Sequence, residues 1–388
     1  MSIKKIMYVS HRYHTNQIPV MKGWYESGVN VKFLSQYEGV GEVHEYVDYH
    51  KMKPSILFVI YSWLVGKIYS PIIAEKKRIT GFVPDIFSLW KTIRDFDPDV
   101  VIYRDYNKCN AIITVICRML GKKNIINYTQ TPIYGYNTKK HLFSNIASFF
   151  YSKICFSPIL YRGAKRDKRD MGTEWYSPKY YVPLICDEPQ SIDKKYCIDG
   201  VVQLLDVGKY RDYKNHFFII KALSEVDDIE RFHLTVIGQL SQQKEYDYYN
   251  ELNKYVEELG LQKNVTIKGN VPYKEMTEIY KNSDILILAS KHEAASISVL
   301  EAMANGLCVM STVNNGTACY LDENKVGFTF NTNNTNEIVN QLNQIANDMN
   351  IVKVEGRKGV EAVKNNYTFK QYKECLNVIT TNNYGINV

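Results

Sequence analysis

The sequence predicts an α/β protein of two doubly wound domains, each a parallel sheet with helices on both faces. Three observations predict this class. Strand-like and helix-like segments alternate along the chain, as they do in βαβ units. The strands of the second half are continuous apolar runs of five to eight residues, the pattern of strands buried on both faces. The length of 388 residues suits two or three domains.

The first half shows this alternation in outline. The strand IMYVS opens it, and a polar loop, HRYHTNQ, leads into a helix that ends near residue 26. Further strands are predicted at 29–35, 98–104 and 124–130, with a helix near 108–120. Insertions at 40–90 and 135–170 interrupt the pattern.

The second half shows the alternation clearly. Strands are predicted at 201–208, 232–238, 264–269, 284–290 and 307–312, and helices at 216–226, 244–259, 273–282 and 296–305. The aperiodic stretch 183–200, rich in Pro, Asp and Lys, marks the boundary between the halves. We expect an N-terminal domain at 1–185, a C-terminal domain at 186–365, and a helical segment at 366–388 that packs back on the first domain.

Composition and charge exclude several classes of protein. The formal net charge of +7 is compatible with anionic substrates or an anionic membrane surface. It is too diffuse for nucleic-acid binding, and no zinc-finger or RNA-binding signature is present. None of the eight cysteines forms a CxxC pair, and several lie in apolar runs. We interpret them as small buried hydrophobes in a reducing cytosol rather than as disulfides or metal ligands.

No segment is predicted to cross a membrane. The N-terminus has too short an apolar core for a signal peptide. The longest apolar stretch, 55–74, is interrupted by Lys67 and Pro71, and falls short of the roughly 18 apolar residues that a span needs. We expect a cytoplasmic protein that is soluble or attached peripherally to the cytoplasmic face of the membrane. Residues 139–169 combine aromatic residues with basic flanks, which indicates either an amphipathic membrane-surface helix or a core-facing helix followed by solvated charges.

Ligands of doubly wound sheets bind at the carboxyl ends of the strands, so the loops there are the candidate site. The loop KYRDYKN carries three cations, Lys209, Arg211 and Lys214, directly after Gly208. These cations form either a solvated loop or a clamp for a diphosphate. The second interpretation gains from Gly208, which lets a ligand approach the backbone closely.

The loop KHEAAS leads into a helix whose N-cap is predicted to be Ser296. A helix that begins among small residues offers unpaired N–H groups to an anion, although the same pattern also caps a purely structural helix. Glu301 lies about 7–8 Å further along this helix, on its apolar stripe. A buried carboxylate needs a partner. Vicinal ribose hydroxyls would provide one, and a salt bridge to a lysine is the alternative.

The two-glutamate signature of retaining GT-B glycosyltransferases of glycosyltransferase family 4 is similar to residues 284–310 of this chain, DILILASKHEAASISVLEAMANGLCVM. VGKYRDYKN resembles the donor loop of that family, with Lys209 where arginine is usual. The strand LTVIGQ, which contains Gly238, and the segment 264–290 also match. The resemblance covers residues 180–330 well and the N-terminal domain in outline. It implies two Rossmann-like domains that face a cleft between them.

The resemblance also implies roles for individual residues. It implies that Glu293, beside the donor sugar, and Lys214, on the diphosphate, are the catalytic residues. It implies that the donor site consists of Gly208, Lys209, Arg211, Lys214, Gly238, Ser296, Ile297, Ser298 and Glu301, with Glu301 on the ribose. It implies catalysis without a metal or cofactor, because cations and helix amides stabilise the leaving phosphate. A UDP- or GDP-sugar is the expected donor, and a glycan or lipid-linked glycan is the expected acceptor, in surface polysaccharide synthesis.

The sequence departs from the family in several places. Ala294-Ala295-Ser296 replaces the usual Gly-Phe-Gly, and no clear glutamate follows Asn314-Asn315-Gly316. On the acceptor side the candidates are His14, Thr15 and Asn16, in place of a glycine pair, with Arg104 and Gln130, the last in place of a histidine. The DxD-like Asp95 and Asp97 directly precede a predicted strand, so we interpret them as a polar turn rather than a metal site.

Other functions remain open on the sequence alone. A sugar epimerase with the same fold would lack the two-glutamate signature, and a phosphorylase would need a far longer chain. A non-catalytic nucleotide-sugar binder or membrane scaffold is disfavoured by the joint presence of Glu293, Lys214 and Glu301.

Overall fold

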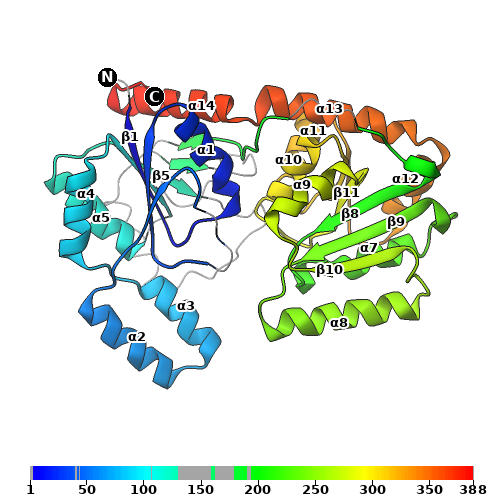
Figure 1. Cartoon of the computed structure of the whole chain (residues 1–388), viewed down its shortest axis with the longest axis horizontal. Coiled ribbons are helices and arrows are strands. Elements are labelled where there is room, and N and C mark those ends of the chain that lie inside the picture. The colour runs from blue at the N-terminus through cyan, green and yellow to red at the C-terminus, as the bar shows by residue number, and fades with distance from the viewer. Residues whose placement is uncertain are drawn as a thin grey trace.

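The computed structural model describes residues 3–39, 42, 44–105, 107–129, 159–161, 179–189 and 194–387. It contains two parallel sheets, each in its own α/β layer structure, set side by side (Figure 1). The predicted fold class is confirmed: both domains are Rossmann-like, with every described strand pair parallel apart from isolated bridges.

The first sheet has seven strands in the order β3-β2-β1-β4-β5-β6-β7. Their bounds are Lys5–Ser10 (β1), Asn30–Ser35 (β2), Asp48–Lys51 (β3), Val100–Arg104 (β4), Ile125–Thr129 (β5), Ile159–Tyr161 (β6) and Lys179–Tyr181 (β7). Alternate residues of β1 enter opposite cores, with Ile6 and Tyr8 on one face and Met7 and Val9 on the other. This alternation follows from the two-residue period of a strand.

Helices cover both faces of this sheet. One core contains α1 (Ile18–Glu26) and α14 (Phe369–Tyr384), and the other contains α4 (Ile86–Phe96) and α5 (Lys108–Met119). The C-terminal helix α14 thus lies on the N-terminal domain (Figure 1). Its Tyr372 ring packs edge to face against the Trp24 ring of α1. Between β3 and α4 the chain forms two further helices, α2 (Ile56–Ile68) and α3 (Pro71–Gly81), which project from the domain.

The second sheet has six strands in the order β10-β9-β8-β11-β12-β13. Their bounds are Val202–Val207 (β8), Phe232–Gly238 (β9), Val265–Gly269 (β10), Ile285–Leu288 (β11), Cys308–Thr312 (β12) and Phe328–Phe330 (β13). One core holds α7 (His216–Leu223), α8 (Gln243–Glu258) and α12 (Asn336–Asn347). The other holds α9 (Tyr273–Lys281), α10 (Ile297–Ala304), α11 (Ala318–Asn324) and α13 (Asn350–Asn366).

The strand order sets the position of the site. β8 and β11 are neighbours, with Ile285 opposite Leu204, so the loops that leave their carboxyl ends lie side by side. These are the loops that contain Lys209–Lys214 and Glu293. The chain crosses between the domains at residues 182–189 and again between α13 and α14, and the two crossings touch where the Cys186 amide donates to the Tyr367 carbonyl oxygen at 3.0 Å.

No helix in the described part of the chain is long and apolar enough to cross a membrane. Seven cysteines are described, all with free thiols, and four of them are buried: Cys109, Cys117, Cys186 and Cys308. Burial raises the pKa of the Cys109 and Cys117 thiols to about 12. These groups therefore remain protonated and pack as small apolar side chains.

Candidate active site

The loop after β8 is shaped around the Lys214 side chain. A Cβ at Gly208 would lie 3.0 Å from Cδ of Lys214, so the glycine leaves room for the lysine chain to pass over the strand end. A Cβ at Gly238 would lie 2.4 Å from the Gly208 carbonyl oxygen, so that glycine permits the close approach of β9. Both glycines predicted for the donor site thus have a local steric cause.

Lys214 and Glu293 meet at the centre of this edge. The Lys214 Nζ donates to both carboxylate oxygens of Glu293, at 2.8 and 2.7 Å, and Ser290 Oγ donates to Oε2 at 3.0 Å. Lys214 is buried, with only 7% of its side chain exposed. An ammonium has three protons, so after both contacts with Glu293 one proton remains for an anionic ligand.

The backbone of Glu293 is fixed by the loop after β12. The Glu293 amide donates to the Asn314 carbonyl oxygen at 3.1 Å, and the Gly316 amide donates to the Glu293 carbonyl oxygen at 3.0 Å. Asn314 and Gly316 occupy the segment that departs from the family pattern. In this chain that segment holds the backbone of Glu293 through main-chain hydrogen bonds.

Arg211 is directed away from the centre of the site. Its Nε and Nη2 donate to Glu245 Oε1 at 2.9 and 2.6 Å, and Nη2 also donates to Gln242 Oε1. The Glu245 side chain is 1% exposed. Burial acts to raise its pKa, but hydrogen bonds from Ser241 and Arg211 outweigh burial and hold the pKa at about 2. Arg211 therefore forms an ion pair with the buried Glu245 of α8.

A second buried pair holds the other end of the loop. His216 Nδ1 lies 2.5 Å from Asp206 Oδ2, and His216 Nε2 lies 3.2 Å from the Lys209 carbonyl oxygen. His216 thus links the Asp206 side chain of β8 to the backbone of the loop at Lys209. Asp206 is the charged residue of β8 and follows the apolar pair Leu204 and Leu205, and this is the signal in the sequence that could have drawn attention to the pair.

Helix α10 begins at the carboxyl end of β11, as predicted. Ser296 is its N-cap residue, but the serine hydroxyl lies 2.7 Å from Ser298 Oγ and makes no capping bond. Ser296 and Ser298 are buried, whereas Ile297 is only half-buried. The first amides of α10 therefore have no side-chain cap among the described residues. They lie on the edge that also carries the Lys214–Glu293 pair.

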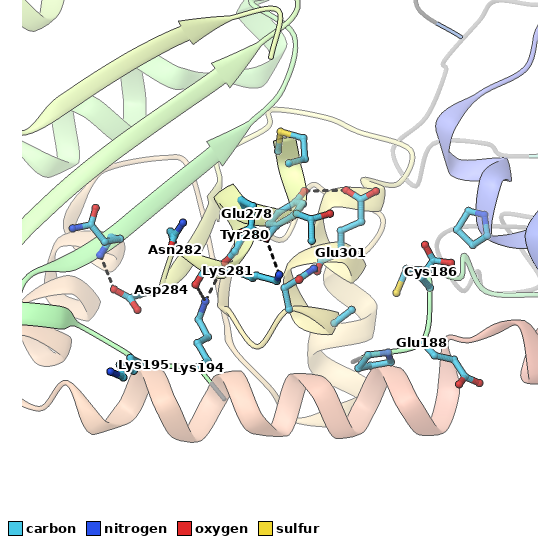
Figure 2. A pocket seen from close by; sticks show the side chains of 18 of the residues that line it. Cys186, Glu188, Lys194, Lys195, Glu278, Tyr280, Lys281, Asn282, Asp284 and Glu301 are labelled. Carbon is cyan, nitrogen blue, oxygen red and sulfur yellow. Dashed lines mark hydrogen bonds and ion pairs between the residues drawn. The ribbon is translucent and has the colours of Figure 1, made fainter. Parts of the chain in front are cut away.

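Glu301 has a tyrosine as its partner. Tyr280 Oη on α9 donates to Glu301 Oε2 at 2.9 Å, and Figure 2 shows the two side chains directed toward each other. Burial raises the pKa of Glu301, and the hydrogen bond from Tyr280 opposes that rise. Within the described part of the chain, the partner of Glu301 is thus a tyrosine and not the lysine of the salt-bridge alternative.

Glu301 also lines a cavity of about 1100 Å³ between α9, α10 and the interdomain crossing (Figure 2). This volume is sufficient for a nucleoside. At the other end of the cavity Lys194 Nζ donates to the Tyr280 and Lys281 carbonyl oxygens at 3.0 and 2.7 Å, and burial lowers the Lys194 pKa to about 8. Of the two glutamates in the signature, Glu301 is the one found among the described residues that line this cavity. Glu293 lies outside the cavity, beyond the N-terminus of α10.

The N-terminal domain brings its own cations to the cleft. Arg12 Nε donates to His14 Nδ1 at 3.3 Å. Burial, together with the charges of Arg104, Arg12 and Lys209, lowers the pKa of His14 to about 3. Lys209 belongs to the other domain, so His14 lies where the two domains approach each other. His14 is therefore neutral at physiological pH.

The remaining acceptor-side candidates have mixed positions. Thr15 is exposed and Asn16 is half-buried in the short 3₁₀ helix Thr15–Gln17. Arg104, at the end of β4, pairs with Asp105 at 3.5 Å. Gln130 and most of residues 139–169 lie outside the described residues. Asp95 pairs with Arg94 at 2.9 Å and Asp97 caps α4, and the described residues contain no cluster of three potential metal ligands.

Both the sequence and the fold of this chain resemble those of known proteins. Residues 190–359 match the family model described as glycosyl transferases group 1. A crystal structure of a glycosyltransferase from Rickettsia africae superimposes with a TM-score of 0.71 and 16% identity, covering 96% of this chain and 99% of that one. HepE of Anabaena, in complex with UDP, superimposes with a TM-score of 0.72 and 10% identity, covering 97% and 100%. The fold is GT-B.

Among curated proteins, mannosylfructose-phosphate synthase of Agrobacterium fabrum is 28% identical over 157 residues. The alignment covers 40% of this chain and 34% of that protein. The chain spans about a third or less of the length of the first curated relatives it matches. The family match and the GT-B neighbours together support a glycosyltransferase. The matched segment includes Gly208, Lys214, Glu293 and Glu301.

Several functional side chains were not found by sequence reasoning. Tyr280, Glu245 and Arg12 are polar residues in ordinary helical or loop contexts, and only the tertiary fold brings them to the site. The arrangement as a whole provides a buried ammonium, a carboxylate beside it and uncapped helix amides at one strand edge. Such a site can bind a diphosphate and place a carboxylate next to the group that the diphosphate carries.

Proposed function

We propose that the chain transfers a sugar from a nucleotide-sugar donor to a glycan or a lipid-linked glycan, in surface polysaccharide synthesis. The observation that carries the proposal is the contact between Lys214 and Glu293 at the carboxyl edge of β8 and β11. It joins a cation suited to a diphosphate with a carboxylate suited to the neighbouring sugar. A purely structural ion pair has no need of the uncapped amides of α10 that face the same edge.

In this proposal the diphosphate lies between Lys214 and the first turn of α10. As the bond between sugar and phosphate breaks, negative charge grows on the leaving diphosphate. The third proton of Lys214 and the α10 amides stabilise that charge, and Lys209 adds a second cation. The reaction then needs no metal ion, and activity in the presence of EDTA tests this point.

Glu293 lies near the sugar in this arrangement. Its carboxylate is held on one side by Lys214 and Ser290, which positions it as an oriented anion beside the developing positive charge of the sugar. The resemblance to family 4 is the ground for proposing that the anomeric configuration is retained. Proton NMR of the first product formed, before the anomers equilibrate, tests retention.

The ribose and base are proposed to enter the cavity beside Glu301. Oε1 of Glu301 has no hydrogen-bond partner among the described residues, so it is available to a ribose hydroxyl while Oε2 holds Tyr280. The acceptor is proposed to approach from the side of the N-terminal domain that carries the cations Arg12 and Arg104 and the neutral His14. UDP- and GDP-sugars are the donors to test first.

A thermal-shift screen of nucleotides and nucleotide-sugars tests the donor half of the proposal, because a ligand that binds only the folded state raises Tm. We expect one nucleotide class to raise Tm, and the same class to support transfer in an assay of released nucleoside diphosphate. The proposal is wrong if no nucleotide-sugar raises Tm and none is consumed.

A further inference from the structure

Helix α2 is apolar around its whole circumference, yet most of its side chains are exposed to solvent. Its sequence is ILFVIYSWLVGKI, and among its described side chains only Val65 counts as buried. Ile56 and Leu57 are each 79% exposed, and Ile68 is 69% exposed. A helix that is apolar all round is normally buried. Isolated exposed apolar residues are common, but a contiguous group of this size marks a binding surface.

The exposed surface continues beyond α2. Residues Pro54 and Pro84 form an isolated bridge, and the Asp85 amide donates to the Lys53 carbonyl oxygen at 2.8 Å. The first turns of α2 and α4 therefore lie together, and α4 contributes Phe87, which is 88% exposed. We call α2, α3 and this first turn of α4 the hairpin surface; Figure 1 shows α2 and α3 projecting from the N-terminal domain.

The projection has internal contacts that hold its shape. Arg78 on α3 donates from Nε and Nη2 to the Ser62 carbonyl oxygen on α2, at 3.3 and 3.1 Å. The rings of Phe58 and Phe82 pack edge to face, 5.1 Å apart, at its base. Because Phe58 and Phe82 anchor it to the core, the outward-facing residues are presented on a fixed scaffold rather than on a loose loop.

Charge distinguishes the possible occupants of this surface. The segment 56–81 contains Lys67, Lys76, Lys77 and Arg78 against one acid, Glu75, so four positive charges less one negative leave a net +3. Lys67 Nζ lies 4.1 Å above the Trp63 ring, and Lys77 Nζ lies 4.5 Å above the Tyr69 ring. If a second copy docked symmetrically on this surface, the positive charges of the two copies would face each other and repel. An anionic lipid surface complements them, and aromatic residues beside lysines are typical of the headgroup level.

Length decides how the hairpin surface would meet the lipid. The 13 residues of α2 extend about 20 Å, shorter than the roughly 30 Å hydrocarbon core of a bilayer. The helix therefore cannot span a bilayer and would lie in its interface. Burial of Leu57, Ile60 and Trp63 in the acyl region gives the affinity, and the lysines add attraction to anionic headgroups.

We propose that the hairpin surface docks the N-terminal domain on an anionic lipid bilayer. The surface follows the carboxyl end of β3, and the carboxyl ends of β1 and β4, which lead into Arg12 and end at Arg104, lie on the same edge of this parallel sheet. The docked membrane is thus next to the cationic acceptor side of the cleft. That consequence rests on the proposed function, whereas the docking itself does not.

Vesicle co-sedimentation of the full chain tests the proposal. The vesicles are phosphatidylcholine alone or phosphatidylcholine with about a third phosphatidylglycerol. The triple variant Leu57→Ser/Ile60→Ser/Trp63→Ser should bind the anionic vesicles at least about tenfold more weakly than the wild type. The matched control, Met119→Ser/Val378→Ser, removes two exposed apolar side chains from α5 and α14 and should bind like the wild type.

A charge variant separates the two contributions. Lys67→Gln/Lys77→Gln should weaken binding to the anionic vesicles and make it less sensitive to salt. An unchanged nucleotide-induced rise in Tm shows that each variant is folded and that docking is being measured apart from donor binding. If the triple variant unfolds, the single Leu57→Ser variant, at a 79% exposed position, takes its place.

Three results would overturn the proposal. One is equal vesicle binding by the wild type and the triple variant at low salt, since the membrane contact would then lie elsewhere, as in residues 139–169. Another is the absence of vesicle binding by the wild type. The third is a wild-type dimer, seen by light scattering, that the triple variant converts to a monomer without any effect of vesicles.

Discussion

Glu301 is the residue whose surroundings the structure changes most. The carboxylate on the apolar stripe of α10 is held by Tyr280 on one oxygen and faces a cavity with the other. Its raised pKa shows that burial is only partly compensated within the chain. A ligand hydroxyl would complete the compensation, which is why the ribose role remains the best proposal for this residue.

The first prediction concerns this carboxylate. Glu301→Ala should weaken binding of the nucleotide that raises Tm by about tenfold to a hundredfold, because a hydrogen bond to a charged group contributes about 1.5–3 kcal/mol. Tyr280→Phe removes the internal donor but leaves the carboxylate, so it should weaken binding much less. Isothermal titration measures both. Equal affinities for the wild type and Glu301→Ala would remove Glu301 from the donor site.

The second prediction concerns His14 and pH. Its folded-state pKa of about 3 lies below the ordinary value of 6.5, so the unfolded chain takes up a proton that the folded chain refuses as pH falls from about 6.5 toward 3. The stability contribution is therefore full above pH 6.5 and declines in acid. His14→Gln should lose less Tm between pH 7.5 and pH 5 than the wild type. Parallel pH profiles for the two proteins would contradict this placement of His14.

At the scale of elements, the loop after β8 is held by one ion pair and one buried hydrogen-bonded pair. Arg211–Glu245 joins it to α8, and Asp206–His216 joins it to α7 and to the Lys209 carbonyl oxygen. Their common effect is to fix the backbone from which Lys214 reaches Glu293. We therefore propose that Arg211 influences donor binding by holding the loop, since its guanidinium is engaged by Glu245 and Gln242.

The third prediction tests that role. Arg211→Ala leaves the Glu245 carboxylate buried without its partner, which should cost about 3–5 kcal/mol and lower Tm. Adding Glu245→Ala removes the orphaned charge, so the double variant should regain part of the lost Tm. Differential scanning calorimetry of the two single variants and the double variant measures the coupling. Additive losses would show that the two residues act independently.

The sequence predicts the C-terminal elements closely because each of them is a long apolar run or a periodic helix. Strand β9 matches its predicted bounds at Phe232–Gly238, and α9 differs by one residue at its end. The first domain is predicted less fully. The β3 sequence, DYHK, does not alternate apolar and polar residues, so it gives no strand signal. The stretch 55–74 resembles a single interrupted apolar segment, but Pro71 starts a new helix within it.

The site shows the same division. Gly208, Lys214, Glu293 and α10 lie in the positions that the motif predicts, because neighbouring strands bring local motifs to one edge. The partners of Arg211 and Glu301 were not predictable, since Glu245 is 34 positions away from Arg211 and Tyr280 lies 21 positions before Glu301. Hydrogen-bond pairs at such separations depend on how helices pack on the sheet, and periodicity does not encode that packing.

On the scale of the whole molecule, the two domains bring cations close enough to influence one another. Arg12 and Arg104 come from the first sheet, and Lys209 comes from the second. Partial burial lowers the pKa of Lys209, and the charge of Arg12 lowers it further. A dianionic ligand between these groups would relieve their mutual repulsion.

The fourth prediction follows from this repulsion. The nucleotide-induced rise in Tm should shrink as salt is raised, and Lys209→Gln should reduce both the rise and its salt dependence. The matched control is Lys221→Gln on the exposed side of α7, which should behave like the wild type. A nucleotide effect that is independent of salt would argue against a cationic donor cleft.

The central claim is that Glu293 serves the transfer step and not the binding of the donor. The most direct measurement compares wild type and Glu293→Gln, with the nucleotide-sugar that raises Tm, for both turnover and nucleotide affinity. The amide keeps an oxygen that can accept from the buried Lys214 but removes its counter-ion, so a melting curve must show that Glu293→Gln is folded at the assay temperature. The account predicts a loss of turnover of at least about a hundredfold with nucleotide affinity largely kept. Unchanged turnover in Glu293→Gln would contradict it.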